Sequence, residues 1–311
     1  MTGGSGRLGT ALVKELLARG KKVKVLARDG NAAVPPGALA HIGDVTKPET
    51  LAGLVGKGDT VFHLAGIIDE GNSYETFYRV NVLGTENALD ACSGNGVKRF
   101  VFVSSISVFG ELEYLPGDER CEKKPITRYG KSKMLAEEAV MRKWKTIPST
   151  IIRPGMVYGP GFDEGYLPVL KMLENGKMPV LGGGGNRIPL IHVSDAVAAM
   201  VAVSESDEAV RKDFVVAGPG NPTQKELLAM ASEALGVEPP KRSVPVWLVL
   251  ALLPLARVLG KADFSPENVG QLTRDRMFDC SKIKKAAGFE PKVPLSQGIK
   301  EMVAYYRQVG R

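Results

Sequence analysis

The chain has 311 residues, a formal net charge of +7 and an isoelectric point of about 9.2. Hydrophobic residues make up 44% and charged residues 24%, a composition that excludes a disordered chain and is typical of a soluble globular protein. The cysteines Cys92, Cys121 and Cys280 form no Cys-x-x-Cys pair. This argues against a disulfide framework or a zinc site, and it predicts a reducing, cytoplasmic location.

The excess positive charge has two interpretations: a lysine-rich solvated surface, or a preference for anionic ligands. No basic stripe is interleaved with aromatic residues, so we expect no nucleic-acid partner. Polar and glycine residues follow Met1 directly, which argues against a signal peptide.

The first half of the chain alternates short β-branched runs with amphipathic stretches. Strands are predicted over residues 22–27, 39–43, 60–65, 99–104 and 150–153. Helices are predicted over residues 7–19, 47–55, 74–92 and 127–145. This alternation indicates parallel βαβ units, and the continuously apolar strands fit a sheet buried on both faces. We therefore predict an α/β, Rossmann-like, doubly wound parallel sheet.

The pattern loosens after residue 160. The four glycines at 182–185 predict a mobile loop, and helices are expected from Thr223 to residue 235, from Ser265 onward and over 281–287. We interpret residues 1–160 as an NAD(P)-binding domain. Residues 161–311 would form a smaller substrate-binding domain, with some segments returning to the first.

One apolar run, residues 244–259, interrupts this second part. It is shorter than the roughly 20 residues of a membrane-spanning helix. We favour a core or lid helix. The alternatives are a peripheral, interfacial membrane helix or the wall of a pocket for a hydrophobic substrate.

A glycine-rich turn opens the chain, with Gly3, Gly6 and Gly9 just before the first expected helix. This spacing allows a tight turn, close approach of a diphosphate and free N–H groups at the helix N-terminus. The segment therefore predicts a dinucleotide-binding loop, which includes Arg7 and Leu8.

Residues that follow the next two strands are candidates for contacts with the adenosine. Arg28 stands where an arginine suits a ribose 2′-phosphate, so it slightly favours NADP over NAD; otherwise it is an exposed charge, and Asp29 could take a hydroxyl. Asp44 and Val45 follow the third expected strand, where they would meet the adenine edge or cap the strand.

The pair Tyr129 and Lys133 carries the strongest chemical signal. Spacing i, i+4 puts both side chains on one face of the expected helix. A free tyrosine has a pKa of about 10, and a nearby lysine cation and an oxidised nicotinamide would stabilise its phenolate. Ser105 and Ser107 follow a strand 24 residues earlier, at the carboxyl edge where a substrate oxygen would lie.

The sequence resembles the extended short-chain dehydrogenase/reductases, the NAD-dependent epimerase/dehydratase family, over nearly its whole length. The matching segments are residues 2–9, 43–45, 62–66, 81–85, 103–110, 129–133, 153–160 and 191–195. The resemblance implies that Tyr129 is the catalytic acid/base, that Lys133 is its partner and holds the nicotinamide ribose, and that Ser105 is the catalytic Ser/Thr. It also implies a homodimer. Cofactor-lining positions by resemblance are Leu64, Ala65, Gly66, Asn81 and, more loosely, Pro154 and Gly155.

Three departures from the family pattern bear on function. Ile106 and Ser107 stand where the dehydratase branch carries an Asp-Glu pair, so sugar dehydration lacks its acid and base. Ile188 occupies the position of the arginine that clamps a nucleotide-sugar diphosphate; Arg187 and Arg276 are the alternative candidates. Only Met1 precedes the glycine loop where the family has an apolar strand, so we expect about five apolar residues before it in the natural protein.

From these residues we predict an NAD(P)-dependent enzyme, most simply a nucleotide-sugar epimerase that transiently oxidises a carbinol carbon. The first alternative is an NADPH-dependent reductase, or a 3β-hydroxysteroid-dehydrogenase-like enzyme, on an apolar ketone or alcohol. The second is a non-catalytic protein that senses the cofactor. No metal is expected.

Overall fold

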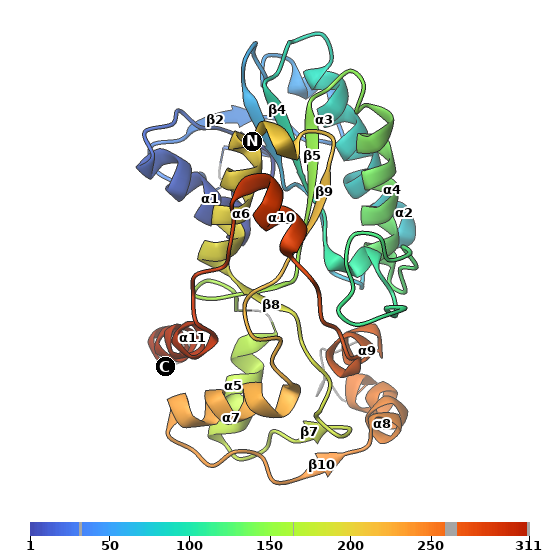
Figure 1. Ribbon diagram of the computed structural model, residues 1–311, viewed down its shortest axis with the longest axis vertical. Coiled ribbons are helices and arrows are strands. Elements are labelled where there is room, and N and C mark those ends of the chain that lie inside the picture. Colours follow the sequence, from blue (N-terminus) through green and yellow to red (C-terminus); the bar gives the residue numbers. More distant parts are fainter. Residues whose placement is uncertain (31–32, 164, 259–265, 310–311) are drawn as a thin grey trace.

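The computed structural model describes residues 1–30, 33–163, 165–258 and 266–309 (Figure 1). Its strands are β1 (Lys24–Ala27), β2 (Leu39–Ile42), β3 (Thr60–His63), β4 (Arg99–Val103), β5 (Ser149–Pro154), β6 (Met156–Tyr158), β7 (Val180–Leu181), β8 (Leu190–His192), β9 (Asp213–Val216) and β10 (Ser243–Val244). Its helices are α1 (Arg7–Ala18), α2 (Tyr74–Phe77), α3 (Gly84–Cys92), α4 (Arg128–Arg142), α5 (Tyr166–Glu174), α6 (Val193–Glu205), α7 (Gln224–Leu235), α8 (Val246–Val258), α9 (Pro266–Thr273), α10 (Ser281–Ala287) and α11 (Leu295–Val309). Short helical turns are η1 (Pro48–Leu51), η2 (Tyr78–Leu83), η3 (Ile106–Val108) and η4 (Asp207–Ala209).

The central sheet is parallel, in the order β3-β4-β5-β9, with the β1-β2 pair beside it. The first two residues of the chain lie between these two groups. Leu26 N donates to Met1 O over 2.8 Å, and Thr2 N donates to Phe62 O over 3.0 Å. Met1 and Thr2 thus hold the central strand position of a doubly wound sheet. The expectation that further residues precede Met1 stays a prediction.

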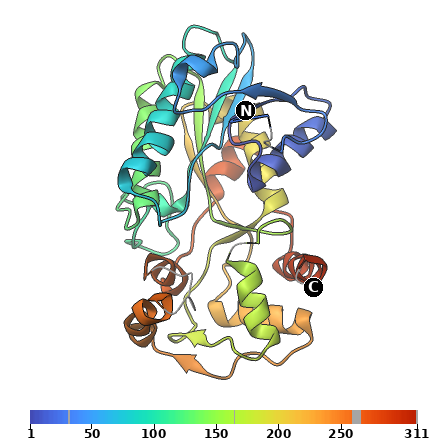
Figure 2. The same cartoon turned by 180° about the vertical axis from the view of Figure 1, so that it is seen from behind.

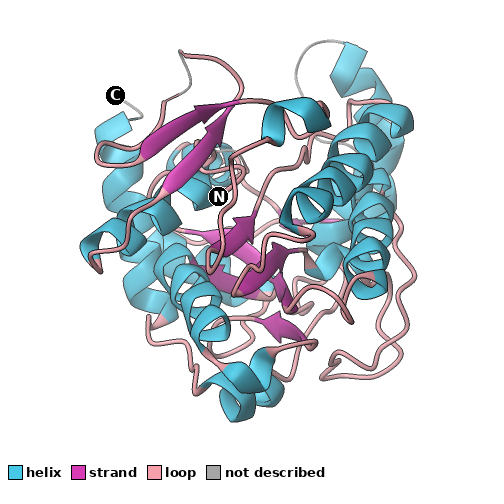
Figure 3. Ribbon diagram, turned by 90° about the horizontal axis from the view of Figure 1, so that it is seen from above, coloured by secondary structure: helices cyan, strands magenta, loops and turns pink. Residues whose placement is uncertain are grey.

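Helices cover both faces of this sheet (Figures 1 and 3). Helix α1 buries Leu12, Val13 and Leu16 in a cluster that also contains apolar side chains of α6. Helices α3 and α4 form a second cluster with Phe100 and Ile151 of the sheet. Because both faces are covered, every residue of β4 and β5 is buried, as the apolar runs predict.

The lower part of the molecule in Figure 1 has its own apolar cluster. Helices α5, α7 and α11 pack together there through Leu170, Leu228 and Val303. Helix α7 begins with the expected capping box between Thr223 and Glu226. β7 pairs with β10, and β6 pairs with β8.

Some segments beyond residue 160 lie against the central sheet. β9 pairs with β5, α6 packs on α1, and α10 packs on α6 and β9. The division into two domains near residue 160, with segments of the second returning to the first, stays a prediction.

Two predicted helices take a different form. Residues 47–55 contain only the short 3₁₀ turn η1, because Pro48 and Gly53 flank a stretch of only four residues. The stretch 74–92 is helical throughout, but η2 is a π-helical segment between α2 and α3.

The favoured interpretation of the apolar run was a core or lid helix; the core helix is wrong for its described side chains, and the lid helix stays a prediction. Helix α8 packs on α9, and Leu253 is buried, but Trp247 is 69% exposed and Leu252 is 53% exposed. The helix lies at the margin of the molecule, and the main apolar clusters contain none of its residues among those described. In the part of the chain that the structure describes, no helix combines the length and apolarity needed to cross a membrane.

Candidate active site

The glycine loop between Thr2 and α1 has no room for side chains on its inner face. Gly3 has a φ of +70°, and a Cβ there would lie 2.6 Å from Ala65 N. A Cβ on Gly9 would lie 2.0 Å from Gly3 O. Gly6 is the N-cap of α1 and has no side chain that could cap the helix. The N-terminus of α1 and the close backbone of the loop fit the diphosphate of a dinucleotide.

The residues predicted to meet the adenosine lie at the ends of β1 and β2, which are neighbours in the sheet. Arg28 is exposed, and Val45 is buried. Burial opposes ionisation of Asp44, but hydrogen bonds from Thr46 and the charge of Arg28 hold the pKa of Asp44 below its ordinary value. The charges of Arg28 and Asp44 therefore influence each other at this end of the β1-β2 pair.

A second group lies at the carboxyl ends of β3 and β4. Asn81 Nδ2 donates to Ser132 Oγ over 2.9 Å, and Asn81 Oδ1 accepts from Ile67 N over 2.8 Å. A Cβ on Gly66 would meet Asn81 Oδ1 at 3.1 Å and Lys133 Nζ at 3.7 Å. The segment 64–66 after β3 is thus fixed beside α4. Leu64 and Ala65 are half-buried there.

The loop after β5 approaches the same edge of the sheet. Pro154 ends β5, and Gly155 N donates to Val216 O over 2.7 Å. A Cβ on Gly155 would lie 2.4 Å from Pro189 O, so only glycine fits where these backbones cross.

The three predicted catalytic side chains meet where β4 ends. Ser105 is the N-cap of η3, while Tyr129 and Lys133 lie one turn apart on α4, which Thr127 caps. Ser105 Oγ lies 3.1 Å from Ser107 Oγ, and Lys133 Nζ donates to Val103 O over 2.7 Å. A Cβ on Gly130 would lie 2.2 Å from Ser107 O, so glycine lets α4 approach the serine segment closely.

Burial governs the ionisation of this group. It raises the pKa of Tyr129 to about 12, although a hydrogen bond with Ser105 acts in the opposite direction. It lowers the pKa of Lys133 to about 8, although the charge of Glu137 opposes that change. From the i, i+4 spacing, Lys133 was expected to stabilise the Tyr129 phenolate. In the structure the lysine ammonium is directed at the Val103 carbonyl, and burial of the phenol dominates.

Glu137, which was not predicted from the sequence, anchors α4 beneath these residues. Its carboxylate accepts from Arg153 Nε and Nη2 over 2.7 and 2.8 Å, and both side chains are fully buried. Arg153 Nη1 lies 2.8 Å from Asp213, and Lys123 Nζ lies 2.6 Å from Glu137. The spacing i, i+4 from Lys133 was the available signal for Glu137.

The candidate arginines Arg187 and Arg276 lie together, because Arg276 N donates to Arg187 O over 3.1 Å. Asp275 accepts two hydrogen bonds from the Arg187 guanidinium, over 3.0 and 2.8 Å, so that charge is already paired. Arg276 is buried, and its Nη2 donates to Gly110 O over 3.2 Å.

Among the described residues, Arg276 Nε and Arg274 Nη1 are buried without a hydrogen-bond partner. Burial, with a smaller contribution from the neighbouring Arg274 charge, lowers the pKa of Arg276 to about 10. Arg274 was not predicted from the sequence, although its i, i+2 spacing from Arg276 is visible there. Together the two guanidinium groups have unused N–H donors that could bind an anion.

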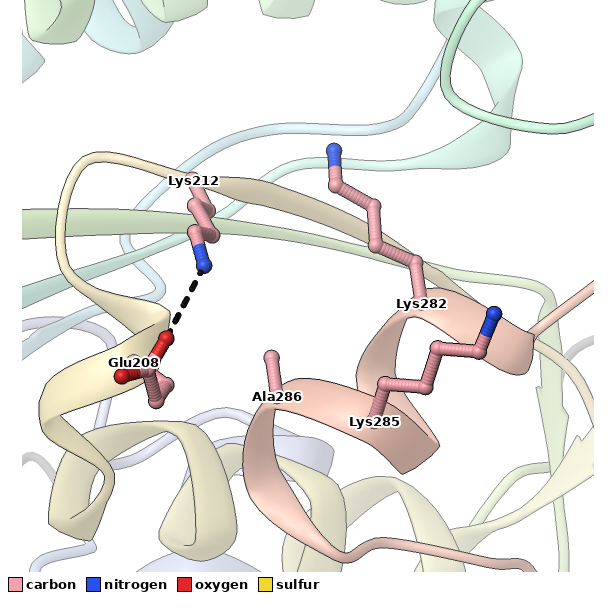
Figure 4. A pocket seen from close by; sticks show the side chains of 5 residues that line it. All are labelled: Glu208, Lys212, Lys282, Lys285 and Ala286. Atoms are coloured by element: carbon pink, nitrogen blue, oxygen red, sulfur yellow. Dashed lines mark hydrogen bonds and ion pairs between the residues drawn. The ribbon is translucent and has the colours of Figure 1, made fainter.

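The pocket in Figure 4 lies elsewhere. Glu208, Lys212, Lys282, Lys285 and Ala286 line it, around η4 and α10. It lies at the amino end of β9, whereas the catalytic candidates lie at the carboxyl ends of the strands, and none of them lines it. In the described ranges no cluster of His, Cys, Asp and Glu side chains is arranged to hold a metal ion.

Comparisons with known proteins agree with this geometry. The profile of the NAD dependent epimerase/dehydratase family matches residues 1–218. Human sterol-4-alpha-carboxylate 3-dehydrogenase, decarboxylating, is 30% identical over 99% of this chain and 88% of its own. UDP-glucose 4-epimerase of Vibrio cholerae is 27% identical over 99% of this chain and 95% of its own.

The same fold occurs in the solved structure of UDP-glucose 4-epimerase from Thermotoga maritima. It has a TM-score of 0.80 and 22% identity, and it covers 100% of this chain and 98% of that one. The family profile and the 30% identical relative each span most of the chain. The chain therefore belongs to the NAD-dependent epimerase/dehydratase family and is an NAD(P)-dependent enzyme of the extended short-chain dehydrogenase/reductase type.

Proposed function

We propose that this enzyme epimerises a nucleotide sugar by transient oxidation of a carbinol carbon. The observation that carries the proposal is the convergence of Ser105, Tyr129 and Lys133 at the carboxyl end of β4. In this proposal Tyr129 is the acid/base, Ser105 hydrogen-bonds the substrate oxygen, and Lys133 orients the cofactor ribose.

In the proposed reaction one hydride and one proton leave the substrate and are then returned to it. NAD(P), when bound, supplies the hydride acceptor, and its oxidised ring adds a positive charge to the site. Tyr129 takes the proton of the substrate hydroxyl while the carbinol carbon loses its hydride and becomes a carbonyl carbon. Return of the hydride to the opposite face, with return of the proton from Tyr129, gives the inverted alcohol.

The buried phenol must lose its proton for this chemistry at neutral pH. With a pKa of about 12, Tyr129 is almost fully protonated when no ligand is present. A positive charge nearby favours the phenolate, because opposite charges within about 4–6 Å stabilise the ionised form. In this proposal Tyr129 acts as a base only when the oxidised cofactor is bound, which is also the state in which the hydride can be transferred.

The arginines of segment 274–276 support an anionic substrate. Arg274 and Arg276 carry buried donors without partners in the described structure, and a diphosphate offers charged acceptors for both. Arg187 would hold this segment in place through Asp275 rather than clamp the diphosphate itself. The name of the Vibrio cholerae relative, UDP-glucose 4-epimerase, points to the same substrate class.

A second candidate is NADPH-dependent oxidation or reduction of an apolar alcohol or ketone, as in 3β-hydroxysteroid dehydrogenases. Two observations favour it: Arg28 is exposed at the end of β1, where a 2′-phosphate would bind, and the human relative is named as a sterol dehydrogenase. The residues proposed to line the cofactor are the same in both candidates.

The quaternary structure and the location of the protein are further proposals. A homodimer rests on the family resemblance, and light scattering of the purified protein tests it. A cytoplasmic location is supported by Cys92, Cys121 and Cys280, all of which are free thiols.

Identification of the cofactor that copurifies with the enzyme separates the two candidates. Mass spectrometry of the denatured protein would find tightly held NAD for an epimerase, which regenerates its cofactor in every turnover. A panel of UDP-sugars would then show interconversion of epimers. Exchangeable NADPH, with turnover of an apolar ketone and of no sugar nucleotide, would overturn the epimerase proposal.

A further inference from the structure

Helix α8 exposes an apolar face on the surface of the protein. From Val246 to Leu253 its sequence, VWLVLALL, contains no polar side chain. Trp247, Leu250 and Ala251, at spacing i, i+3, i+4, are exposed on one face, and Leu252 extends that face. A surface helix of a globular protein normally turns polar residues toward solvent, whereas this face of α8 presents apolar side chains.

Basic residues border the apolar run in the sequence. Between Pro239 and Val258 the chain contains Lys241, Arg242 and Arg257 but no Asp or Glu. Lys241 and Arg242 are exposed just before β10, and Lys241 also contacts the exposed Glu238. An exposed apolar face near basic residues is complementary to a lipid bilayer, in which anionic headgroups lie over a hydrocarbon core. It does not match a second copy of itself, which would bring the same cations together.

The position and length of α8 suit a helix that lies flat on a bilayer. Figures 1 and 2 show α8 and α9 side by side at one margin of the molecule, far from α1, β1 and β2. Thirteen residues extend about 20 Å at 1.5 Å per residue, well short of the roughly 30 Å hydrocarbon core. A tryptophan at the edge of the apolar face is typical of a membrane interface.

We propose that the α8 surface, formed by Trp247, Leu250, Ala251 and Leu252, docks the enzyme onto anionic lipid bilayers together with the exposed Arg242, four residues before the helix begins. The helix lies in the interface plane with this face among the acyl chains, while Arg242 contacts lipid phosphates. The proposal does not depend on which substrate the active site takes.

Tryptophan fluorescence gives a direct test, because the chain has only two tryptophans, Trp144 and Trp247. A Trp144→Phe variant leaves Trp247 as the sole emitter. Vesicles of phosphatidylcholine with 30% phosphatidylglycerol should shift its emission to shorter wavelength. Phosphatidylcholine brominated along the acyl chains, in the same mixture, should quench it. Pure phosphatidylcholine vesicles should give a several-fold weaker response.

Charge and apolarity are tested separately by flotation with the same anionic vesicles. Leu252→Asp should reduce the bound fraction at least ten-fold, since it places a carboxylate on the docking face. Arg242→Glu should weaken binding several-fold and reduce its dependence on salt. Val309→Asp is the matched control, because Val309 is 49% exposed on α11, and it should bind like the parent.

Each variant must keep the thermal midpoint and cofactor affinity of the parent, which separates lost docking from lost folding. Unquenched Trp247 in brominated anionic vesicles would overturn the proposal. So would a concentration-dependent dimer in sedimentation that Leu252→Asp converts to monomer without any lipid binding. A failure of the epimerase assay alone would leave the lipid measurements unchanged.

Discussion

Replacement of Arg276 by methionine should separate stability from binding. The buried guanidinium has one described hydrogen bond, from Nη2 to Gly110 O, and its Nε has no partner in the described structure. Its pKa is lowered from the ordinary arginine value to about 10, mainly by burial and further by Arg274, which corresponds to about 3 kcal/mol of destabilisation. Because the group is charged in both the folded and the unfolded protein at neutral pH, the full cost is present there.

Arg276→Met removes that cost, fills much of the same space with an apolar chain and loses one hydrogen bond of about 1 kcal/mol. We expect the ligand-free variant to be about 2 kcal/mol more stable than the parent in urea unfolding. Its affinity for uridine diphosphate should fall roughly 10- to 100-fold in calorimetric titration, since each charge-assisted hydrogen bond contributes about 1.5–3 kcal/mol.

Arg142→Met is the matched control. Arg142 pairs with Glu86 over 2.8 Å on the surface, where such pairs contribute about 0–1 kcal/mol, so stability and binding should both stay close to the parent. A destabilised Arg276→Met variant that binds uridine diphosphate normally would refute the reasoning and make Arg276 a structural residue.

Three further changes test other parts of the account. Glu137→Gln should lower the free energy of unfolding by about 3–5 kcal/mol, because it removes the carboxylate that pairs with the buried Arg153 guanidinium. The control Glu86→Gln, at a surface ion pair, should lower it by less than about 1 kcal/mol. Burial opposes the ionisation of Glu137, but Arg153 and Lys123 hold its pKa below the ordinary 4.5. The free energy of unfolding of the parent, measured in urea titrations, should therefore fall as the pH drops below about 4.5. Glu137→Gln should show a smaller decrease over the same pH range. Arg28→Ala should weaken NADP binding about 10-fold or more and leave NAD binding nearly unchanged, and equal effects on both would make Arg28 a surface charge. Gly9→Ala should abolish cofactor binding in fluorescence titration, since its Cβ would lie 2.0 Å from Gly3 O. Unchanged cofactor affinity would show that this loop does not bind the dinucleotide.

The elements of the central sheet were predictable because local signals and tertiary context agree there. Apolar runs predicted β3, β4 and β5, since strands buried on both faces carry few polar residues. The spacing of Tyr129 and Lys133 on one helical face placed both beside the serine segment, because parallel strands end at one edge.

Features that depend on contacts between distant segments were not predictable. The pairing of Arg187 with Asp275 joins residues 88 positions apart, and no local pattern signals it. The apolar run of α8 gave a misleading signal, since composition does not say whether an apolar helix is covered. The ionisation of Tyr129 also depends on how deeply the folded chain buries it, which the i, i+4 spacing does not contain.

Proton transfer by Tyr129 is the step on which the proposed epimerisation depends. The turnover of Tyr129→Phe on the sugar nucleotide that the parent enzyme epimerises measures that step. We expect a loss of roughly 10²–10⁴-fold in turnover, with cofactor affinity within two-fold of the parent. The control Tyr74→Phe, at a partly exposed tyrosine outside the proposed catalytic group, should retain full turnover. Turnover of Tyr129→Phe within a few-fold of the parent would contradict the claim.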